Sequence, residues 1–250
     1  MLEDVEKSII GWEWKTEGGL LYGSNGAPKS FTTKIALLDM DGCLIVNKSK
    51  KKNPENAKDW VWFDKKEVPK TLNKYHADGY RLVIATNQKG ISLGHVNKKE
   101  ICAKIEDIAD TLNLPMSALI ATDDDFFRKP LPGMWNFLAE KFSDGQQVSK
   151  SDSFFVGDAA GRPKTKTTQK DWNDTDLKFA ANAGLKFYTP EEFFYGWDQK
   201  DLVVNLENCE RHPAYELLAA QSSDPNLFID QPNTPNFTKG NFLFFTKLNF

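Results

Sequence analysis

Short apolar runs, each followed at once by polar residues, recur along the first three quarters of the chain. Apolar runs bounded by turn residues are typical of strands that are buried on both faces of a sheet. Between the runs, apolar residues recur at helical spacing, most clearly over 98–112. Strands that alternate with helices in this way predict an α/β fold with a parallel sheet and helices on both faces. The runs lie at residues 35–38, 80–85, 119–121, 153–156 and 185–188.

The two ends of the chain do not follow this alternation. Residues 1–30 hold several Trp, Ile and Leu residues, and we expect them to form an N-terminal flap that packs on the core. Beyond the expected domain, Pro residues stand among Asn and Asp, which predicts a partly ordered C-terminal tail over 198–250. The domain itself is therefore expected to span residues 31–197.

Polar side chains that can do chemistry stand after the predicted strands. They are Asp39 and Asp41 after the first run, Thr86 after the second, Lys129 after the third and Asp158 after the fourth. The carboxyl ends of parallel strands share one edge of a sheet, and ligands of α/β proteins bind at that edge. We therefore expect these side chains to meet in one site, although Asp and Gly are also ordinary turn residues.

The first pair of carboxylates predicts a metal ion. Two neighbouring carboxylates repel each other unless a cation lies between them. An oxygen-rich site of this kind suits Mg²⁺, which we expect to be the cofactor. The expected ligands are the Asp39 carboxylate, the backbone carbonyl of Asp41 and the Asp158 carboxylate.

This set of groups supports the hydrolysis of a phosphate monoester. Asp39 can attack phosphorus in line and form an aspartyl-phosphate. Asp41 can protonate the leaving alkoxide as a general acid and then activate the water that hydrolyses the intermediate. Thr86 and Lys129 can donate hydrogen bonds to the equatorial phosphate oxygens.

Composition and charge exclude some classes of function. The chain has 250 residues, is 40% hydrophobic and has a net charge of −3, so its overall charge does not indicate a nucleic-acid partner. We expect no membrane association, because no apolar run reaches the length of a bilayer span and the N-terminus lacks the features of a signal peptide. The three widely spaced cysteines have no zinc-binding spacing and are expected to be reduced thiols.

Two polar loops, at residues 47–59 and 163–174, are rich in lysine. Each can be interpreted as a solvated loop, or as a surface that contacts a phosphate backbone; the first also resembles a nuclear-import signal. Thr86 follows Asp41 by only 45 residues, and Lys129 follows Thr86 by 43, which leaves little room for a lid domain. We therefore expect an open site that suits the end of a polymer.

Longer motifs carry a resemblance to a known family. D-M-D-G at 39–42, T-N at 86–87 and G-D at 157–158, together with a lysine, resemble the haloacid dehalogenase superfamily of phosphohydrolases. The strings G-D-A-A-G-R-P at 157–163 and T-P-E-E-F-F at 189–194 are similar to the phosphatase domain of the polynucleotide kinase 3′-phosphatase family. The resemblance covers roughly residues 10–197, and it implies a haloacid dehalogenase-like (Rossmannoid) sheet without a large cap domain.

The resemblance implies a Mg²⁺-dependent phosphatase that removes 3′-phosphates from DNA strand ends in DNA strand-break repair, and hence a location in the nucleus. The partners of such an enzyme would be DNA ends, and the C-terminal tail is a candidate contact for repair proteins. We expect the protein to be a monomer. The implied catalytic residues are Asp39 and Asp41, and the implied phosphate-binding residues are Thr86, Asn87 and Lys129.

Further roles come from the same resemblance. Asp176 matches an acidic position of the family, so the expected metal site comprises Asp39, Asp41, Asp158 and Asp176. The residues expected to contact DNA are Arg128, Arg162 and Lys170. For Arg162, an ion pair within the site is an equal alternative.

The chain departs from the family pattern in two ways. Cys43 stands where the family usually has Thr, and a thiol is a poorer hydrogen-bond donor than a hydroxyl. The change could weaken the positioning of Asp39 or the phosphate, and the sequence leaves its effect on the rate open. The chain also has no G-x-x-x-x-G-K-[ST] string, and too few residues follow Tyr195 to form a kinase domain, so we expect no 5′-kinase activity.

Two alternative functions remain open. One is a small-molecule phosphatase of the same superfamily, although such enzymes commonly carry a Cys/His zinc loop that this sequence lacks. The other is a catalytically weak protein that binds DNA ends, in which Cys43 would mark decayed activity. The sequence leaves open whether single-stranded, nicked or double-stranded ends are preferred.

Overall fold

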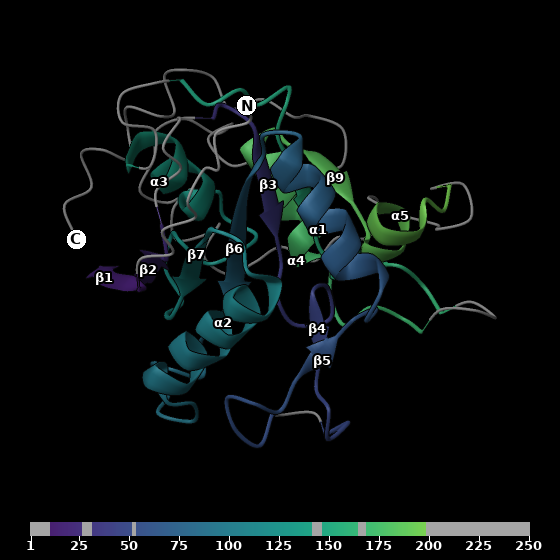
Figure 1. The fold of residues 1–250 in the computed structure, drawn as a ribbon. Coiled ribbons are helices and arrows are strands. Elements are labelled where there is room, and N and C mark those ends of the chain that lie inside the picture. The colour runs from purple at the N-terminus through teal and green to yellow at the C-terminus, as the bar shows by residue number, and fades with distance from the viewer. Residues whose placement is uncertain (1–10, 27–31, 52–53, 142–146, 165–168, 199–250) are drawn as a thin grey trace, which may run out of the picture.

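The protein is described here by a computed structural model, which covers residues 11–26, 32–51, 54–141, 147–164 and 169–198. Within these ranges a seven-stranded sheet runs in the order β1-β2-β7-β6-β3-β8-β9, and helices pack on both of its faces (Figure 1). The α/β class predicted from the sequence is therefore confirmed. The parallel strands are β3 (Ile35–Leu38), β6 (Arg81–Asn87), β7 (Met116–Ala121), β8 (Phe154–Val156) and β9 (Lys186–Tyr188).

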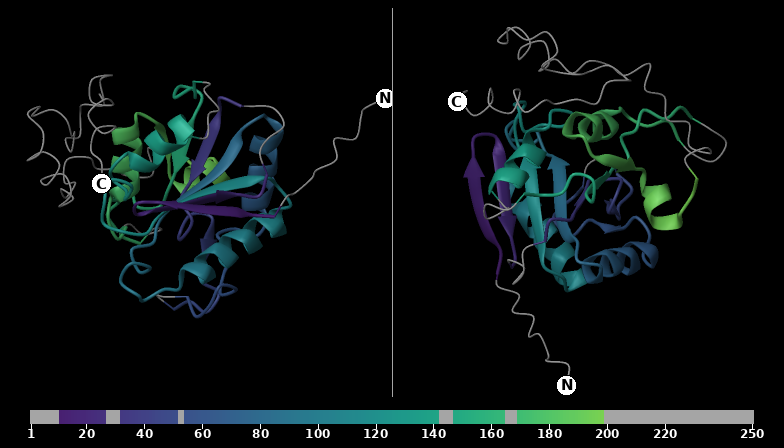
Figure 2. Two further views of the ribbon diagram at one scale, coloured as in Figure 1. Left: turned by 90° about the vertical axis from the view of Figure 1, so that its left-hand side faces the viewer. Right: turned by 90° about the horizontal axis from the view of Figure 1, so that it is seen from above.

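Two hydrophobic clusters, one on each face of the sheet, form the core. One cluster joins the sheet to α1 (Glu67–Ala77), α2 (Lys98–Leu112) and α5 (Pro190–Tyr195). The other joins it to α3 (Gly133–Lys141) and α4 (Thr175–Ala183), and Figure 2 shows the sheet between these two layers. Because successive residues of a strand point to opposite faces, β3 contributes alternate residues to both clusters.

Local sequence signals account for the ends of several helices. The Asn97 side chain accepts a hydrogen bond from the backbone N–H of Lys99 at the start of α2, and Asn113 ends that helix in a left-handed conformation. At α5, Thr189 and Glu192 form a reciprocal capping box, as the T-P-E-E string predicts. None of the helices in the described ranges is long and apolar enough to span a bilayer.

The N-terminal segment differs from the flap that we expected. Over the described residues it forms a hairpin of β1 (Glu13–Glu17) and β2 (Leu20–Ser24), and β2 pairs antiparallel with β7 at the edge of the sheet. Leu20 and Leu21 are both buried, one in each hydrophobic cluster, so the segment extends the sheet. Trp12 and Trp14 pack against the cluster on the α2 side, as packing on the core requires. The tail expected over 198–250 lies, apart from its first residue, outside the described residues.

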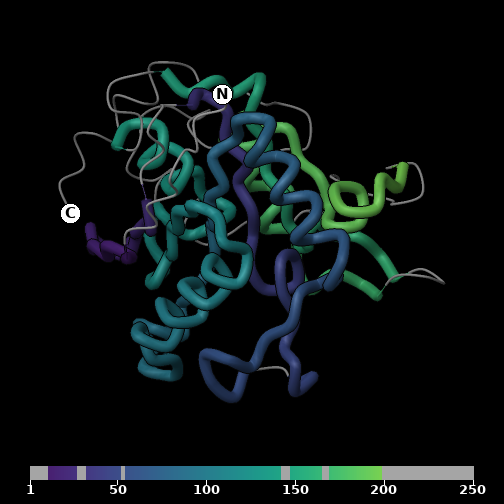
Figure 3. The backbone as a smooth tube through the Cα atoms, in the orientation of Figure 1, coloured from purple at the N-terminus to yellow at the C-terminus, as the bar shows by residue number. Residues whose placement is uncertain are grey.

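A small second sheet lies just beyond the end of β3. It is formed by β4 (Ile45–Val46) and β5 (Val61–Trp62), and Figure 3 follows the chain from β3 through this hairpin into α1. The connection from β6 to β7 contains α2. The described residues between β3 and β6, and those between β6 and β7, form no separate cap domain. This agrees with the short spacing of the motifs.

We predict that Leu20→Ala lowers the free energy of unfolding by about 2–5 kcal/mol, because this side chain fills space between β2 and the cluster around α3. Urea denaturation would measure the change. Lys15→Ala on exposed β1 is the control and should change the free energy by less than about 0.5 kcal/mol. Equal, small effects of both substitutions would show that the hairpin does not belong to the sheet.

Candidate active site

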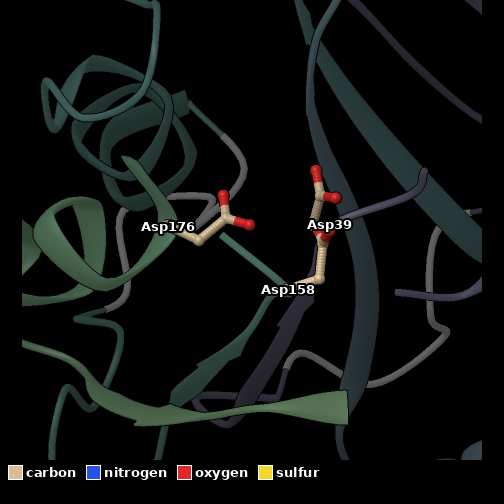
Figure 4. Close-up of side chains that lie close together, drawn as sticks. All are labelled: Asp39, Asp158 and Asp176. Carbon is tan, nitrogen blue, oxygen red and sulfur yellow. The ribbon is translucent and has the colours of Figure 1, made fainter. Parts of the chain in front are cut away.

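Acidic side chains from three separate segments meet at the carboxyl edge of the parallel strands. Asp39 follows β3, Asp158 follows β8, and Asp176 lies in the first turn of α4. Each offers one carboxylate oxygen, and these oxygens lie within 4.8 Å of one another (Figure 4). The structure thus brings together three of the four predicted metal-binding aspartates.

The Lys129 ammonium lies between two of these carboxylates. Its Nζ is 2.6 Å from Asp39 Oδ1 and 2.7 Å from Asp176 Oδ1, and the residue is only 2% exposed. The Asn87 side chain holds the backbone of the lysine, since its Oδ1 accepts from Lys129 N at 3.0 Å and its Nδ2 donates to Lys129 O at 2.9 Å. Asn87 therefore holds the backbone of Lys129, and the two carboxylates hold its ammonium.

This use of Asn87 differs from the phosphate-binding role that we expected. Both polar ends of its side chain already bond to the backbone of Lys129. The structure thus gives Asn87 a part in placing the lysine, whereas the lysine ammonium itself faces the carboxylates.

Burial and mutual repulsion govern the protonation of the carboxylates. The pKa of Asp39 is raised well above its ordinary value, mainly by burial and also by Asp176 and Asp158, although Lys129 opposes the rise. Burial and the neighbouring Asp176 raise the pKa of Asp158 to about 7. Burial alone would lower the pKa of Lys129, but Asp176 and Asp39 outweigh it and raise that pKa.

The donor set fits a divalent cation. Three carboxylates face one ammonium, which leaves an excess of negative charge in a buried place. Asp176 has protein partners on both oxygens, because Lys129 contacts Oδ1 and the backbone N–H of Ala159 donates to Oδ2 at 3.1 Å. Asp39 and Asp158 are therefore the better placed ligands, and hard oxygen donors suit ions such as Mg²⁺.

A glycine allows Asp158 to approach the turn after β3. Gly42 has a φ of 87°, a conformation that other residues rarely adopt, and a Cβ atom there would lie 2.5 Å from Asp158 Oδ2. The D-M-D-G string thus has a steric reason for its glycine as well as a chemical reason for its aspartates.

Asp41 lies apart from the three carboxylates. It is exposed, and its Oδ2 accepts a hydrogen bond at 2.7 Å from Nε2 of Gln88. The same nitrogen lies 3.1 Å from Oγ1 of Thr86, which is 2% exposed. The side chain of Asp41 is therefore not part of the cluster, and metal binding through its backbone carbonyl stays a prediction.

Arg162 is held in a buried ion-pair network. Its Nε donates to Asp171 Oδ2 at 2.8 Å, its Nη1 to Glu191 Oε2 at 2.7 Å, and its Nη2 to the backbone carbonyl of Asp158 at 3.1 Å. Because the side chain is only 7% exposed, it does not offer its charge to a DNA backbone as we had expected. Of our two interpretations, the structure supports the ion pair, which holds the loop that carries Asp158.

The other two residues expected to contact DNA lie nearer the surface. Arg128 Nε is 3.3 Å from Asp124 Oδ1, and Lys89 Nζ is 2.6 Å from Asp124 Oδ2, so one carboxylate joins two cations beside the site. Lys170 is exposed on the loop before Asp171. Contact of these residues with DNA stays a prediction.

The comparison with known families now identifies the group to which the fold and the site belong. The family model described as polynucleotide kinase 3 phosphatase matches residues 34–194. The chain belongs to this family. Two solved structures support the fold. A HAD-like phosphatase from Mesorhizobium loti is 20% identical, has a TM-score of 0.53, and is matched over 68% of this chain and 78% of its own. A D,D-heptose 1,7-bisphosphate phosphatase from B. bronchiseptica, complexed with magnesium and phosphate, is 20% identical, has a TM-score of 0.50, and is matched over 75% of this chain and 99% of its own.

Proteins that are similar to this chain are of several lengths. An uncharacterized 20.8 kDa protein of Autographa californica nuclear polyhedrosis virus is 40% identical over 64% of this chain and 85% of its own length. The bifunctional polynucleotide phosphatase/kinase of Schizosaccharomyces pombe is 39% identical over 86% of this chain but only 50% of its own length. The polynucleotide 3′-phosphatase ZDP of Arabidopsis thaliana is 32% identical over 73% of this chain and 27% of its own length. The chain thus spans half or less of these last two relatives.

Three residues that the sequence analysis did not single out as site residues belong to the site. Gln88 joins Asp41 to Thr86, while Asp171 and Glu191 hold Arg162. Of these three, only Glu191 lies in a string quoted above for the family resemblance, and no periodic or charge pattern marks any of them. Their roles depend on contacts between segments that are far apart in the sequence.

We predict that Asp158→Asn stabilises the metal-free protein at pH 8, by about 1–3 kcal/mol, because it removes one of three facing carboxylates. The folded-state pKa of Asp158 is raised to about 7 from an ordinary 3.8, so the folded state binds the proton more tightly, and wild-type stability should fall as the pH rises from about 4 to 7. Urea denaturation in a chelating buffer at several pH values would show a shallower fall for the variant.

The exposed Asp123 provides a matched control, and Asp123→Asn should change the free energy of unfolding at pH 8 by less than about 0.5 kcal/mol. A variant of Asp158 that is less stable than wild type at pH 8, with the same pH dependence, would contradict the proposed repulsion.

Proposed function

We propose that this chain removes the 3′-phosphate from DNA strand ends through an aspartyl-phosphate formed on Asp39. The observation that carries the proposal is the buried contact of Asp39 with Lys129, beside Asp158 and within the carboxyl edge of the sheet. Membership of the polynucleotide kinase 3 phosphatase family supports the choice of substrate. Polynucleotide 3′-phosphatases are among the relatives, including the one from Saccharomyces cerevisiae, which is 38% identical over 28% of this chain.

In the first half of the reaction, an oxygen of Asp39 forms a bond to phosphorus in line with the bond that breaks. The electron pair of the broken bond stays on the 3′-oxygen of the sugar, and this oxygen takes a proton from Asp41. Asp41 is exposed, which suits an acid that must meet a leaving group from solvent. The products are a free 3′-hydroxyl and phosphorylated Asp39.

In the second half, water hydrolyses the phosphorylated aspartate. The Asp41 carboxylate accepts a proton from the water as the water oxygen attacks phosphorus. The bond from phosphorus to Asp39 then breaks, which releases inorganic phosphate and restores both aspartates. Thr86 and Lys129, which face the same site, would donate to the equatorial phosphate oxygens.

Mg²⁺ would be held by Asp39, Asp158 and the backbone carbonyl of Asp41, and would reduce the repulsion between anionic Asp39 and the anionic substrate. Asp176 would contribute by holding Lys129, with which it pairs at 2.7 Å. The cations Lys89 and Arg128 beside the site, and exposed Lys170, fit a phosphate backbone. We further propose that the protein acts as a monomer in nuclear DNA strand-break repair.

Phosphate release from an oligonucleotide with a 3′-phosphate tests the proposal. We predict turnover in the presence of Mg²⁺, none after chelation, and a loss of at least about a thousandfold for Asp39→Asn, because the amide cannot attack phosphorus. Asp110→Asn, on the exposed side of α2, is the matched control and should keep wild-type turnover.

Two results of the same assay would contradict the proposal. Turnover of sugar phosphates with no release from the oligonucleotide would favour a small-molecule phosphatase. Binding of the oligonucleotide without any turnover would favour a protein that only binds DNA ends, with Cys43 rather than Thr beneath the site.

We also predict that the purified chain does not transfer phosphate from ATP to a 5′-hydroxyl oligonucleotide, because its 250 residues contain no G-x-x-x-x-G-K-[ST] string. Incubation with γ-labelled ATP and electrophoresis of the oligonucleotide would measure the transfer. ATP-dependent labelling of the 5′-end by the pure protein would overturn this prediction.

A further inference from the structure

Gln88 occupies a central position between two groups of the proposed mechanism. It directly follows β6, and its backbone N–H donates to the carbonyl of Ala121 at 2.7 Å, which fixes where the side chain starts. Its Nε2 lies 2.7 Å from Asp41 Oδ2 and 3.1 Å from Thr86 Oγ1. A side-chain amide nitrogen carries two N–H groups, so it can serve both oxygens at once.

The chemistry of Asp41 determines which end of the amide faces it. A carboxyl oxygen that carries no proton can only accept a hydrogen bond, so Oδ2 of Asp41 accepts its bond from the amide nitrogen of Gln88 and not from the amide oxygen. The contact occupies Oδ2 of Asp41. The other oxygen is thus left to carry the proton that the leaving group takes.

The second contact determines the direction of the Thr86 hydroxyl. Because Oγ1 accepts a hydrogen bond from Gln88, its own proton must point elsewhere. Thr86 is buried at the end of β6, at the edge where the phosphate would lie. The hydroxyl is therefore oriented as a donor before the substrate arrives.

We propose that Gln88 is a positioning residue, which links the leaving-group acid Asp41 to the phosphate-binding hydroxyl of Thr86. The inference rests on the proposed function, because it assumes the roles given there to both residues. Asp41 needs such a partner, since it is exposed and precedes Gly42, so packing does not hold its side chain. Through Gln88, the acid keeps a fixed place relative to the phosphate and to the oxygen that it protonates.

Two substrates with different leaving groups distinguish this role from a general structural one. The 3′-oxygen of a sugar leaves as a strongly basic alkoxide and needs a proton, whereas p-nitrophenolate leaves p-nitrophenyl phosphate without one. For both substrates, kcat/KM reports the reaction up to the first irreversible step, which is the loss of the leaving group. A defect in the placement of Asp41 should therefore affect the sugar phosphate far more than the aryl phosphate.

Gln88→Met keeps the length of the side chain and removes its N–H groups. We expect kcat/KM for a 3′-phosphorylated oligonucleotide to fall by about 10–100-fold, and that for p-nitrophenyl phosphate by less than about threefold. Gln88→Glu, which has the same shape and places a second carboxylate beside Asp41, should show the same selectivity with a larger loss. Gln147→Met, the same change at an exposed position before β8, should leave both values at the wild-type level.

The possible outcomes separate this inference from the proposed function. If the Gln88 variants lose activity equally on the two substrates, or lose none on either, the role of Gln88 is overturned. In that case turnover of the oligonucleotide by the wild-type protein still upholds the proposed function. A wild-type protein that turns over neither substrate would contradict the proposed function and this inference with it. Melting temperatures of the two Gln88 variants within a few degrees of wild type would exclude misfolding as the cause of a loss.

Discussion

The buried ammonium of Lys129 is the interaction on which the rest of the site depends. A lysine that is 2% exposed stays charged only if carboxylates compensate for the lost hydration, and Asp39 and Asp176 do so. The same carboxylates would repel each other and Asp158 without the lysine. One cation thus joins the end of β3, the turn before α3 and the first turn of α4. Because one ammonium cannot neutralise three carboxylates, the site keeps a net negative charge, which favours a divalent metal ion.

A surrounding layer of contacts keeps these groups in place. Asn87 bonds to both backbone groups of Lys129, and Arg162 bonds to the backbone carbonyl of Asp158. Arg162 in turn pairs with Asp171 and with Glu191 on α5, so the last helix of the described domain supports the loop at the site. The family strings G-D-A-A-G-R-P and T-P-E-E-F-F are therefore physically connected, because Arg162 belongs to the first and Glu191 to the second.

Much of this arrangement could be predicted from the sequence, because it follows from periodic patterns. The apolar runs fix the parallel strands, and their ends bring Asp39, Thr86 and Asp158 to one edge. The antiparallel placement of β2 could not be predicted, since the pattern of Leu20 and Leu21 shows burial but not which strand they join. Charge was also ambiguous: the sequence does not tell a buried arginine such as Arg162 from one that meets solvent, because the difference lies in distant acidic partners.

A crystal structure of the protein with Mg²⁺ and beryllofluoride, a mimic of a phosphoryl group on aspartate, tests the central claim most directly. The account predicts beryllium bonded to an Asp39 oxygen, the metal on Asp39 and Asp158, and fluorines in contact with Thr86 and Lys129. Beryllofluoride bound to another aspartate, or a Lys129 ammonium that leaves Asp39 and turns away from the bound group, would contradict it.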